Sequence, residues 1–472
     1  MQTPILNSSG TRYVILGAAR SGLAAAELLL SRGKNVLLLD EKPASALGGI
    51  MHDLCRLQIP VLFGPINPDK PPLDPGDVLV LSPGVPLTAP LVRAALRIGI
   101  PVTGELELAS RFTRLPMAAI TGTNGKSTTT CLLAEMLTAG GKRSLASGNV
   151  GYALSGAVLQ AAEEGWRSLV VEVSSFQLET IQTFRPRVAV ILNLTPDHLS
   201  RHGSMENYRD IKFRISENQT GGDTLILNAD DPWLAPLARK SRARVLWFCL
   251  RGPVDQGAWL EGDHLWMSLE HKKHLLERKD IPIPGLHNVQ NILAAALAAA
   301  AFEIPETVIA DTVRKFRGVE HRIEYAAALE GVDFYNDSKA TNLDSVEKAL
   351  ESFSRPIVLI AGGRDKGEDY NRLNSLVGKR VRRLIVMGES AALIEKAWGS
   401  CVPWEHVDNM GEAVRTAFSR ARPGDVVLLS PGCSSFDMFQ DFEERGRVFK
   451  AEVMKIVGNG SGLSEGVKER GI

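Results

Sequence analysis

The sequence predicts three consecutive α/β domains, of which the first and third are Rossmann-like and the central one is built around a phosphate-binding loop. Short apolar runs alternate with helical patterns along most of the chain, which is typical of parallel sheets covered by helices. Many of these runs end in glycine-rich or polar loops, and the length of 472 residues exceeds that of one ordinary domain. We place the domains at residues 1–104, 105–318 and 319–472.

Charge and cysteine content exclude several classes of protein. Lys plus Arg and Asp plus Glu number 54 each, so no net field favours nucleic acid or an anionic membrane as a partner. The five cysteines form no Cys-x-x-Cys pair, which fits reduced thiols in a cytosol. The longest apolar helix, residues 292–302, is too short for membrane insertion, and no signal-peptide pattern opens the chain. We therefore expect a cytoplasmic protein.

The first domain opens with a strand at residues 13–16, a turn from Gly17 to Gly22 and a helix. A second strand at 35–39 ends at Asp40, which completes the order of a Rossmann unit. Ala19 replaces the middle glycine of Gly-x-Gly-x-x-Gly, which disfavours a dinucleotide, and the outer glycines alternatively serve only tight packing. A third strand at 78–81 ends in a small-residue loop at the same edge, so we expect a ligand there.

The central domain begins with the stretch from Met117 to Thr130. An apolar strand precedes the loop Thr-Gly-Thr-Asn-Gly-Lys-Ser-Thr, and a helix follows it. Gly122 and Gly125 let the backbone curl so that N–H groups face a phosphate, and Lys126 supplies a positive charge. The hydroxyl of Ser127 or Thr128 suits a magnesium ion bound to the nucleotide. Ile120 stands where the general P-loop has its first glycine, so this is a variant of the motif.

Further polar residues follow the strands of the central domain. Glu172 is embedded in the apolar run 169–173, His198 follows the run 188–194, and the helical segment 208–214 brings Lys212 towards the same edge. A carboxylate, an imidazole and a hydroxyl form a ligand set for Mg²⁺ or Mn²⁺. Alternatively, Glu172 belongs to a buried ion pair and His198 caps a helix.

Two later segments carry further candidate residues. Asn288 and Asn291 share a face at the start of a helix, where they either cap it or bind a purine edge. In the third domain, strands at 332–335, 356–361, 383–387 and 425–429 end in polar loops. Lys339, Lys366 and the hydroxyls of Thr341, Ser434 and Ser435 suit an acidic small molecule. The tail 458–472 lacks apolar periodicity, and we expect it to be disordered.

These motifs, in this order, resemble the Mur ligases over nearly the whole chain. The resemblance rests on the phosphate loop, Gly148-Asn149-Val150-Gly151, Glu172-Val-Ser-Ser-Phe-Gln-Leu-Glu179, Asp197-His198, His287-Asn288 and His321-Arg-Ile-Glu324. The stretches Asp337-Ser-Lys-Ala-Thr-Asn342, Ser430-Pro-Gly-Cys-Ser-Ser-Phe-Asp437 and Phe442-Glu-Glu-Arg-Gly446 resemble the branch that adds D-glutamate.

The resemblance implies an ATP-dependent amide-forming ligase of cell-wall (peptidoglycan) synthesis, with a central P-loop-type ATPase domain. It would join D-glutamate to UDP-N-acetylmuramoyl-L-alanine through an acyl phosphate, and we expect a monomer. The phosphate loop (Gly122, Thr123, Asn124, Gly125, Lys126, Ser127, Thr128) and Asn288, Asn291, Arg322 and Asp337 would bind ATP. Ser127, Glu172, His198 and a carbamylated Lys212 would hold the metal, and Lys126, Glu172, His198 and Lys212 would be catalytic. Arg20, Ser21, Asp40, Ser82, Gly84 and Asn149 would bind the UDP-linked substrate, and Lys339, Thr341, Lys366, Ser435 and Phe442 would bind D-glutamate.

Two other functions share part of this pattern. A folylpolyglutamate synthase-like ligase has the same loop but no complete first domain, and a non-catalytic nucleotide-binding protein has no need of Glu172, His198 and Lys212 together. We also expect that the third domain swings onto the second during catalysis, with hinges near Gly104 and Gly318, because the acyl phosphate must be kept from water.

Overall fold

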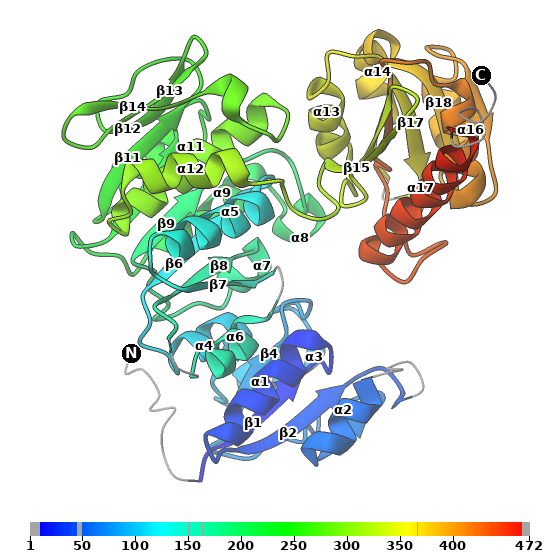
Figure 1. The fold of residues 1–472 in the computed structure, drawn as a ribbon. Helices are drawn as coiled ribbons and strands as arrows, with labels where there is room; N and C mark the ends of the chain where they lie inside the picture. Colours follow the sequence, from blue (N-terminus) through cyan, green and yellow to red (C-terminus); the bar gives the residue numbers. More distant parts are fainter. Residues whose placement is uncertain (1–9, 45–49, 150–151, 163–164, 366, 465–472) are drawn as a thin grey trace, which may run out of the picture. The chain divides into compact units, whose positions relative to one another are not determined.

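The computed structural model describes residues 10–44, 50–149, 152–162, 165–365 and 367–464. The chain forms two compact units (Figure 1). One consists of Met1–Arg278 with Gln290–Val313, and the other of Lys279–Val289 with Arg314–Ile472. The described residues contain three β-sheets, and their α/β character agrees with the predicted fold class.

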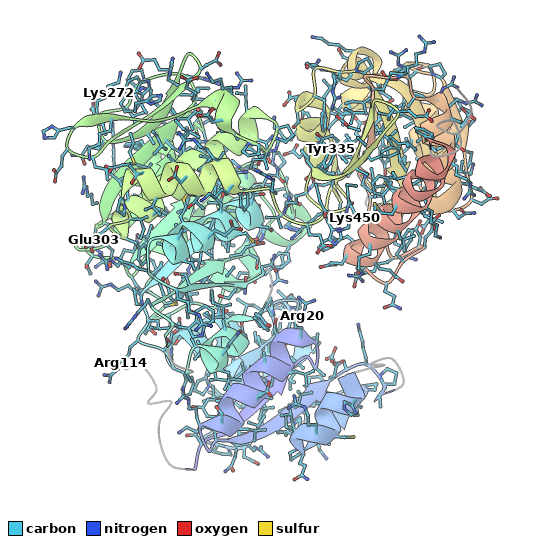
Figure 2. All side chains as sticks on the ribbon, in the orientation of Figure 1. Arg20, Arg114, Lys272, Glu303, Tyr335 and Lys450 are labelled. Carbon is cyan, nitrogen blue, oxygen red and sulfur yellow. The ribbon has the colours of Figure 1, made fainter. Side chains whose placement is uncertain are left out.

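The sheet nearest the N-terminus is parallel and has the strand order β3-β2-β1-β4-β5. Its elements are β1 (Arg12–Leu16), α1 (Arg20–Ser31), β2 (Asn35–Asp40), α2 (Ile50–Leu57), β3 (Val61–Phe63), β4 (Val78–Leu81), α3 (Pro90–Arg97) and β5 (Val102–Gly104). β1 lies between β2 and β4, so the chain direction across the sheet reverses at the end of β1. Ligands bind at such switch points. Arg20 begins the helix that follows this point (Figure 2).

The central sheet has the strand order β14-β13-β12-β11-β10-β9-β6-β8-β7, with a parallel body and an antiparallel edge. Its strands are β6 (Met117–Thr121), β7 (Ser144–Gly148), β8 (Ser168–Glu172), β9 (Val188–Ile191), β10 (Thr224–Asn228), β11 (Arg244–Cys249), β12 (Gly257–Glu261), β13 (His264–Ser268) and β14 (Lys272–Glu277). Its helices are α4 (Glu105–Ser110), α5 (Lys126–Ala139), α6 (Leu154–Gln160), α7 (Ser175–Leu178), α8 (Leu199–His202), α9 (Met205–Phe213), α10 (Ala235–Ala238), α11 (Leu286–Ala301) and α12 (Glu306–Lys315). The switch point of this sheet is β6, because β8 and β9 flank it and lead to opposite sides.

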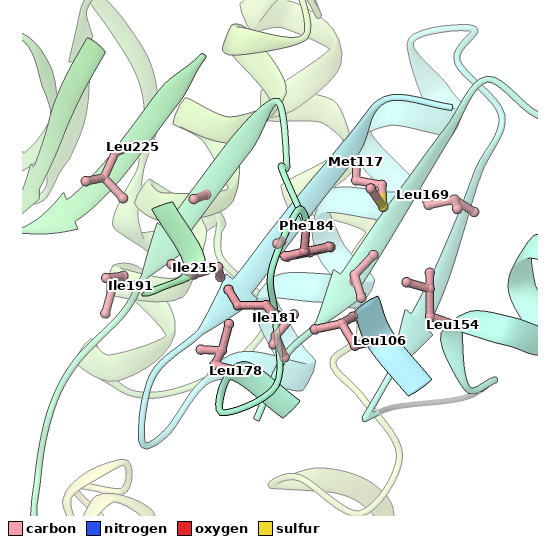
Figure 3. Close-up of a cluster of buried hydrophobic side chains, with 14 of the residues drawn as sticks. Leu106, Met117, Leu154, Leu169, Leu178, Ile181, Phe184, Ile191, Ile215 and Leu225 are labelled. Atoms are coloured by element: carbon pink, nitrogen blue, oxygen red, sulfur yellow. The ribbon is translucent and has the colours of Figure 1, made fainter. Parts of the chain in front are cut away.

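The core of the first unit explains why the strands are continuous apolar runs. Ala118, Ala119 and Ile120 of β6 are fully buried, because side chains cover both faces of the sheet. On one face, Leu106 of α4 and Leu154 of α6 pack with Met117, Leu169 and others (Figure 3). Burying a leucine or isoleucine side chain contributes about 1.5–3 kcal/mol, so these contacts stabilise the strand that leads into the phosphate loop.

The second unit contains a sheet of order β15-β16-β20-β17-β18-β19, in which only β15 runs antiparallel to its neighbour among the described strands. Its strands are β15 (Glu324–Leu329), β16 (Val332–Asn336), β17 (Ile357–Gly362), β18 (Val381–Met387), β19 (Trp404–His406) and β20 (Val426–Leu429). Its helices are α13 (Leu343–Glu351), α14 (Asn374–Arg380), α15 (Ala391–Trp398), α16 (Met410–Arg420) and α17 (Phe442–Ser464). Buried apolar clusters lie on both faces.

The last helix corrects one expectation. α17 continues to Ser464, so residues 458–464 are helical although we expected the tail from 458 to be disordered. A helix that is already formed extends at the cost of one ordered residue per added hydrogen bond, and no proline interrupts this stretch. Residues 465–472 lie outside the described part of the chain. Within that part, no helix is long and apolar enough to cross a membrane.

Candidate active site

The phosphate loop joins β6 to α5 at the switch point of the central sheet, and its two glycines occupy positions that exclude a side chain. Gly125 has φ 84°, and a Cβ atom there would lie 2.2 Å from Oδ1 of Asn291. Gly122 has φ 148°, and its Cβ would lie 2.9 Å from that of Leu192 on the next strand. Asn291, which is 3% exposed, therefore lies directly against the loop.

Two lysines meet at one carbonyl of this loop. Lys126 Nζ donates to the carbonyl oxygens of Gly122 at 2.9 Å and Thr123 at 2.7 Å. Lys212 of α9 also donates to the Gly122 oxygen, at 2.9 Å. Lys212 is 2% exposed, and burial together with the charge of Lys126 holds its pKa well below the ordinary 10.5, despite Asp197 and Glu172. Burial and the Lys126 charge thus both favour the neutral amine of Lys212.

Glu172 ends β8 beside the first turn of α5. It is 1% exposed, and its Oε2 accepts a hydrogen bond of 2.6 Å from the hydroxyl of Ser127. Its Oε1 accepts a bond of 3.1 Å from Nδ2 of Asn149, which follows β7. The predicted metal ligands Ser127 and Glu172 are therefore adjacent, and Asn149 orients the carboxylate.

His198 lies in the loop after β9, next to Asp197. Its φ is 54°, its side chain is about half exposed, and its Nε2 lies 3.5 Å from Oδ2 of Asp197. Its ring packs on Phe176 of α7, with centroids 4.9 Å apart. It stands at the N-cap of α8 but makes no side-chain capping bond, so the capping interpretation loses its basis.

The turn after β1 is shaped by its own neighbours. Asp40 accepts hydrogen bonds from the N–H groups of Ala18 at 2.8 Å and Lys42 at 2.9 Å. Ser82 donates to the Gly17 oxygen at 3.0 Å, and a Cβ on Gly22 would lie 1.9 Å from that same oxygen. The interpretation of the glycines as packing residues thus has a geometric basis. Three other predicted residues of this edge, Arg20, Ser21 and Gly84, lie partly or fully exposed.

In the second unit, the structure brings Lys339 and Phe442 together. Lys339 Nζ lies 5.1 Å from the centre of the Phe442 ring. Asp337 is buried, accepts from the Ser430 hydroxyl at 2.8 Å, and has its pKa raised by burial to about 7. Thr341 is half buried, and Ser435 is 2% exposed within its turn. Lys366 lies outside the described residues.

Arg322 and Asn288 also belong to the second unit. Arg322 lies in a tight turn, in which its backbone N–H donates to the Val319 oxygen at 3.1 Å. The Nδ2 of Asn288 donates to the Pro284 oxygen at 2.7 Å, which holds the start of α11. This bond is not the helix cap left open for Asn288, in which the side-chain oxygen would accept from a helix N–H, while Asn291 lies against the phosphate loop.

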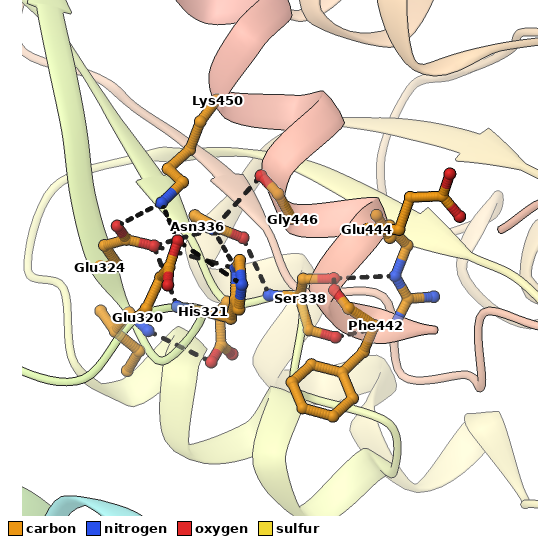
Figure 4. Close-up of polar contacts among 12 residues, drawn as sticks. Glu320, His321, Glu324, Asn336, Ser338, Phe442, Glu444, Gly446 and Lys450 are labelled. Atoms are coloured by element: carbon orange, nitrogen blue, oxygen red, sulfur yellow. Dashed lines mark hydrogen bonds and ion pairs between the residues drawn. The ribbon is translucent and has the colours of Figure 1, made fainter. Parts of the chain in front are cut away.

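A polar cluster connects this turn to α17 (Figure 4). Lys450 donates to Glu320 at 2.6 Å and to Glu324 at 2.8 Å, and Asn336 contacts both Glu324 and the buried His321 at 2.9 Å. These groups include the one described set of acids and histidine close enough to hold a metal, Glu320, His321 and Glu324. The Lys450 ammonium already contacts both carboxylates, so we assign no ion to this set.

Comparison with known proteins decides the family. Three family models match in succession: a Mur ligase MurD-like N-terminal domain at residues 11–104, a Mur ligase middle domain at 120–299, and a Mur ligase, glutamate ligase domain at 321–433. A UDP-N-acetylmuramoylalanine–D-glutamate ligase of Pelotomaculum thermopropionicum is 45% identical over 94% of this chain and 98% of its own length. The same-named protein of a Thermoanaerobacter species is 42% identical over 95% and 99%. The chain belongs to the Mur ligase family.

Solved structures of Mur ligases share the fold. The MurC ligase of Thermotoga maritima has a TM-score of 0.60 at 19% identity and covers 94% of this chain and 99% of its own. The MurF ligase of the same organism, solved with ADP, has a TM-score of 0.60 at 17% identity and covers 89% and 95%. The predicted fold class and family are thereby confirmed. The domain boundaries at 104/105 and 318/319 remain predictions.

Several residues of this Mur ligase were not predicted to support the site. Asn193 and Thr195 bind the phosphate loop, as does Tyr208 of α9, whose hydroxyl lies 3.2 Å from Thr123 Oγ1. Arg445 of α17 binds the oxygens of Ser338 at 2.7 Å and Cys433 at 3.1 Å. In the sequence these residues are marked only by their position, as polar residues after an apolar run or near the start of a helix, and many residues share that feature.

Proposed function

We propose that this Mur ligase joins D-glutamate to UDP-N-acetylmuramoyl-L-alanine with the hydrolysis energy of ATP, in peptidoglycan synthesis. The observation that carries the proposal is the near-complete coverage of relatives with this name at 41–45% identity. A folylpolyglutamate synthase-like function is disfavoured because residues 11–104 match a MurD-like N-terminal domain.

The residues of the phosphate loop account for the first chemical step. The terminal carboxylate of the L-alanine residue attacks the γ-phosphorus of ATP, the bond to the bridging oxygen breaks, and ADP leaves with an acyl phosphate formed. Charge grows on the transferring phosphoryl oxygens in this step, and Lys126 at the start of α5 is placed to stabilise it. Its Nζ now donates to the Gly122 and Thr123 carbonyls, and a phosphate oxygen would replace them as acceptor.

The donors around Glu172 fit a divalent metal. A buried carboxylate and a hydroxyl 2.6 Å apart are hard oxygen ligands of the kind Mg²⁺ prefers, and a bound Mg²⁺ would neutralise charge on the ATP phosphates. Ser127, Glu172 and His198 would hold it. Asn291 meets the loop that binds the phosphates, and Asn288, Arg322 and Asp337 would contact the rest of ATP.

Lys212 would complete the metal site as a carbamate. Its neutral amine can attack CO₂, forming an N–C bond and releasing one proton from Nζ, and the product is an anion with two oxygen donors. The support is its burial and lowered pKa, since an ammonium has no lone pair for this reaction. The negative charge of the carbamate would also be attracted to the neighbouring Lys126 ammonium.

The second step forms the amide. The amine of D-glutamate attacks the acyl carbon, a tetrahedral intermediate forms, and phosphate leaves. Lys339 and Thr341 would bind the carboxylates of D-glutamate with Lys366 and Ser435, beside the Phe442 ring. Arg20, Ser21, Asp40, Ser82, Gly84 and Asn149 would bind the UDP-linked substrate. We propose that the enzyme is a monomer and that it acts in the cytoplasm, where ATP and UDP-linked precursors are found.

Phosphate release tests the proposal. The enzyme is incubated with ATP, Mg²⁺ and UDP-N-acetylmuramoyl-L-alanine, and D-glutamate is compared with L-glutamate, meso-diaminopimelate and L-lysine. We expect release only with D-glutamate, and a product mass equal to the UDP-linked dipeptide. Lys126→Ala should remove release under the same conditions. Release driven by another amino acid would overturn the acceptor assignment, and no release with any acceptor would overturn the ligase assignment.

A further inference from the structure

The first half of the phosphate loop is held by the segment that follows β9. The N–H of Thr123 donates to the Asn193 oxygen at 2.9 Å, and the N–H of Thr195 donates to Oγ1 of Thr123 at 3.0 Å. The Asn193 side chain adds a reciprocal pair of bonds. Its Oδ1 accepts from the Asn124 N–H at 2.9 Å, and its Nδ2 donates to the Asn124 oxygen at 3.1 Å.

This pair of bonds does for Asn124 what a neighbouring strand does for a strand residue. One primary amide binds both the backbone donor and the backbone acceptor of the same residue, which needs one N–H and one C=O in a fixed relation. Aspartate in the same place offers two acceptors, and alanine offers neither. Of these three side chains, only the amide of asparagine therefore satisfies both backbone groups of Asn124, and its two bonds hold the loop in this conformation.

The bonds to Asn193 also determine which N–H groups of the loop can bind a phosphate. The N–H groups of Thr123 and Asn124 both donate to Asn193, so a phosphate is met by donors after residue 124. These belong to Gly125 and the first turn of α5, where helix geometry leaves N–H groups without intrahelical acceptors. Asn124 is the residue immediately before that turn.

We propose that Asn193 is a positioning residue for the nucleotide: by fixing both backbone groups of Asn124, it sets where the first turn of α5 presents its donors. The identity of the nucleotide as ATP rests on the proposed function. Asn193 itself touches neither phosphate nor amino acid in this account. Its effect should therefore appear in nucleotide affinity and leave the D-glutamate site unchanged.

A matched pair of variants tests this. Asn193→Asp keeps the acceptor for the Asn124 N–H but sets an oxygen against the Asn124 carbonyl. Asn218→Asp is the control, because it also sets an oxygen against backbone carbonyls, but in the segment that precedes β9. The Nδ2 of Asn218 donates to the oxygens of Gln182 at 3.0 Å and Phe184 at 3.1 Å. Both should lower the melting temperature.

The readouts are the dissociation constant of ADP with Mg²⁺ by calorimetry and the KM values for ATP and D-glutamate. For Asn193→Asp we expect the ADP constant and the KM for ATP to rise about tenfold, with the KM for D-glutamate changed by less than about twofold. Asn193→Ser, which keeps one hydroxyl, should lie between Asp and wild type and serves if the first variant does not fold.

The proposal is overturned if ADP binds Asn193→Asp as tightly as it binds wild type, or if Asn218→Asp weakens ADP binding equally. ADP binding needs no acceptor, so it separates this proposal from the proposed function. A wild-type enzyme that binds ADP but ligates no D-glutamate contradicts the function and leaves the comparison of variants valid.

Discussion

Two glutamates of α4 should respond to the same substitution in opposite ways. Glu107 is fully buried and accepts hydrogen bonds from the backbone N–H groups of Gln182, Thr183 and Phe184, from the Thr183 hydroxyl and from Arg111. Glu105 is also buried; it accepts from the Ser155 N–H at 2.6 Å, and its Oε2 has no hydrogen-bond partner among the described residues. We predict that Glu107→Gln destabilises the protein and that Glu105→Gln does not.

The contacts give the size of the difference. A glutamine at 107 keeps one carbonyl for the three backbone N–H groups, and its NH₂ then faces Arg111 Nε at 2.7 Å and the Thr183 hydroxyl at 2.6 Å. Two charge-assisted bonds are lost, while Arg111 keeps its contact with the Gln182 side chain at 3.0 Å. At about 1.5–3 kcal/mol for each bond to a charged group, less what rearrangement recovers, the cost is about 2–4 kcal/mol.

The pH dependence should also be opposite. Burial alone would raise the pKa of Glu107, but the bonds from Gln182, Thr183 and Arg111 lower it overall, whereas burial raises the pKa of Glu105. The contribution of Glu107 is therefore present above its unfolded pKa of about 4.3 and is lost as the pH falls towards its lower folded value. The penalty for ionised Glu105 is present at neutral pH and disappears as the pH falls through its raised folded pKa.

Urea unfolding followed by tryptophan fluorescence, at pH 7.5 and pH 5, measures both effects. At pH 7.5 the midpoint of Glu107→Gln should fall well below wild type, and that of Glu105→Gln should equal or exceed it. At pH 5 the urea midpoint of wild type should rise relative to that of Glu105→Gln. Equal midpoints for the two variants at pH 7.5 would refute the reasoning, because burial alone would then decide the effect of each carboxylate.

Three further predictions concern the site. Lys212→Met should abolish ligation but keep the fold, and a ¹³C carbamate signal seen by NMR after addition of labelled bicarbonate to wild type should be absent from it. Gly125→Ala should raise the dissociation constant of ADP by at least about tenfold, because its Cβ would lie 2.2 Å from Asn291 Oδ1 at a φ of 84°, and Gly141→Ala, at a φ of 81° with open space around it, is the control. Arg445→Lys should lower the stability of the second unit by about 3 kcal/mol in urea unfolding, since a lysine cannot reach the oxygens of both Ser338 and Cys433.

The strands and the phosphate loop could be predicted because their signals are local. Met117 to Ile120 is an apolar run bounded by glycine, and the next residues begin a helix, so neighbouring residues alone determine β6, the loop and α5. Glu172 is likewise recognisable from neighbouring residues alone, as a carboxylate embedded in an apolar run. The strands β12 to β14 were not predicted, because their exposed edge carries charged residues such as Lys272 and Lys273 that interrupt the apolar pattern.

The partners of the loop could not be predicted, because they depend on strand order. Asn193 reaches Asn124 across 69 residues only because β9 pairs with β6 and not with β8. Asn291 reaches Gly125 because the N-terminal part of α11 lies over the same strand end. The local sequence pattern indicates which residues end each strand, but which strands lie side by side depends on how the whole sheet packs.

The structure also bears on the hinge expected near Gly104. β5 is bonded to β4 of the first sheet up to Gly104, and α4 begins at the next residue. Gly104 itself leaves no room, because a Cβ there would lie 2.1 Å from Oγ1 of Thr180, and Glu107 then ties α4 to residues 182–184. No loop residue separates the end of β5 from the start of α4. A hinge needs residues whose backbone angles can change without breaking such contacts, so the first two sheets should move as one body, consistent with their place in a single compact unit.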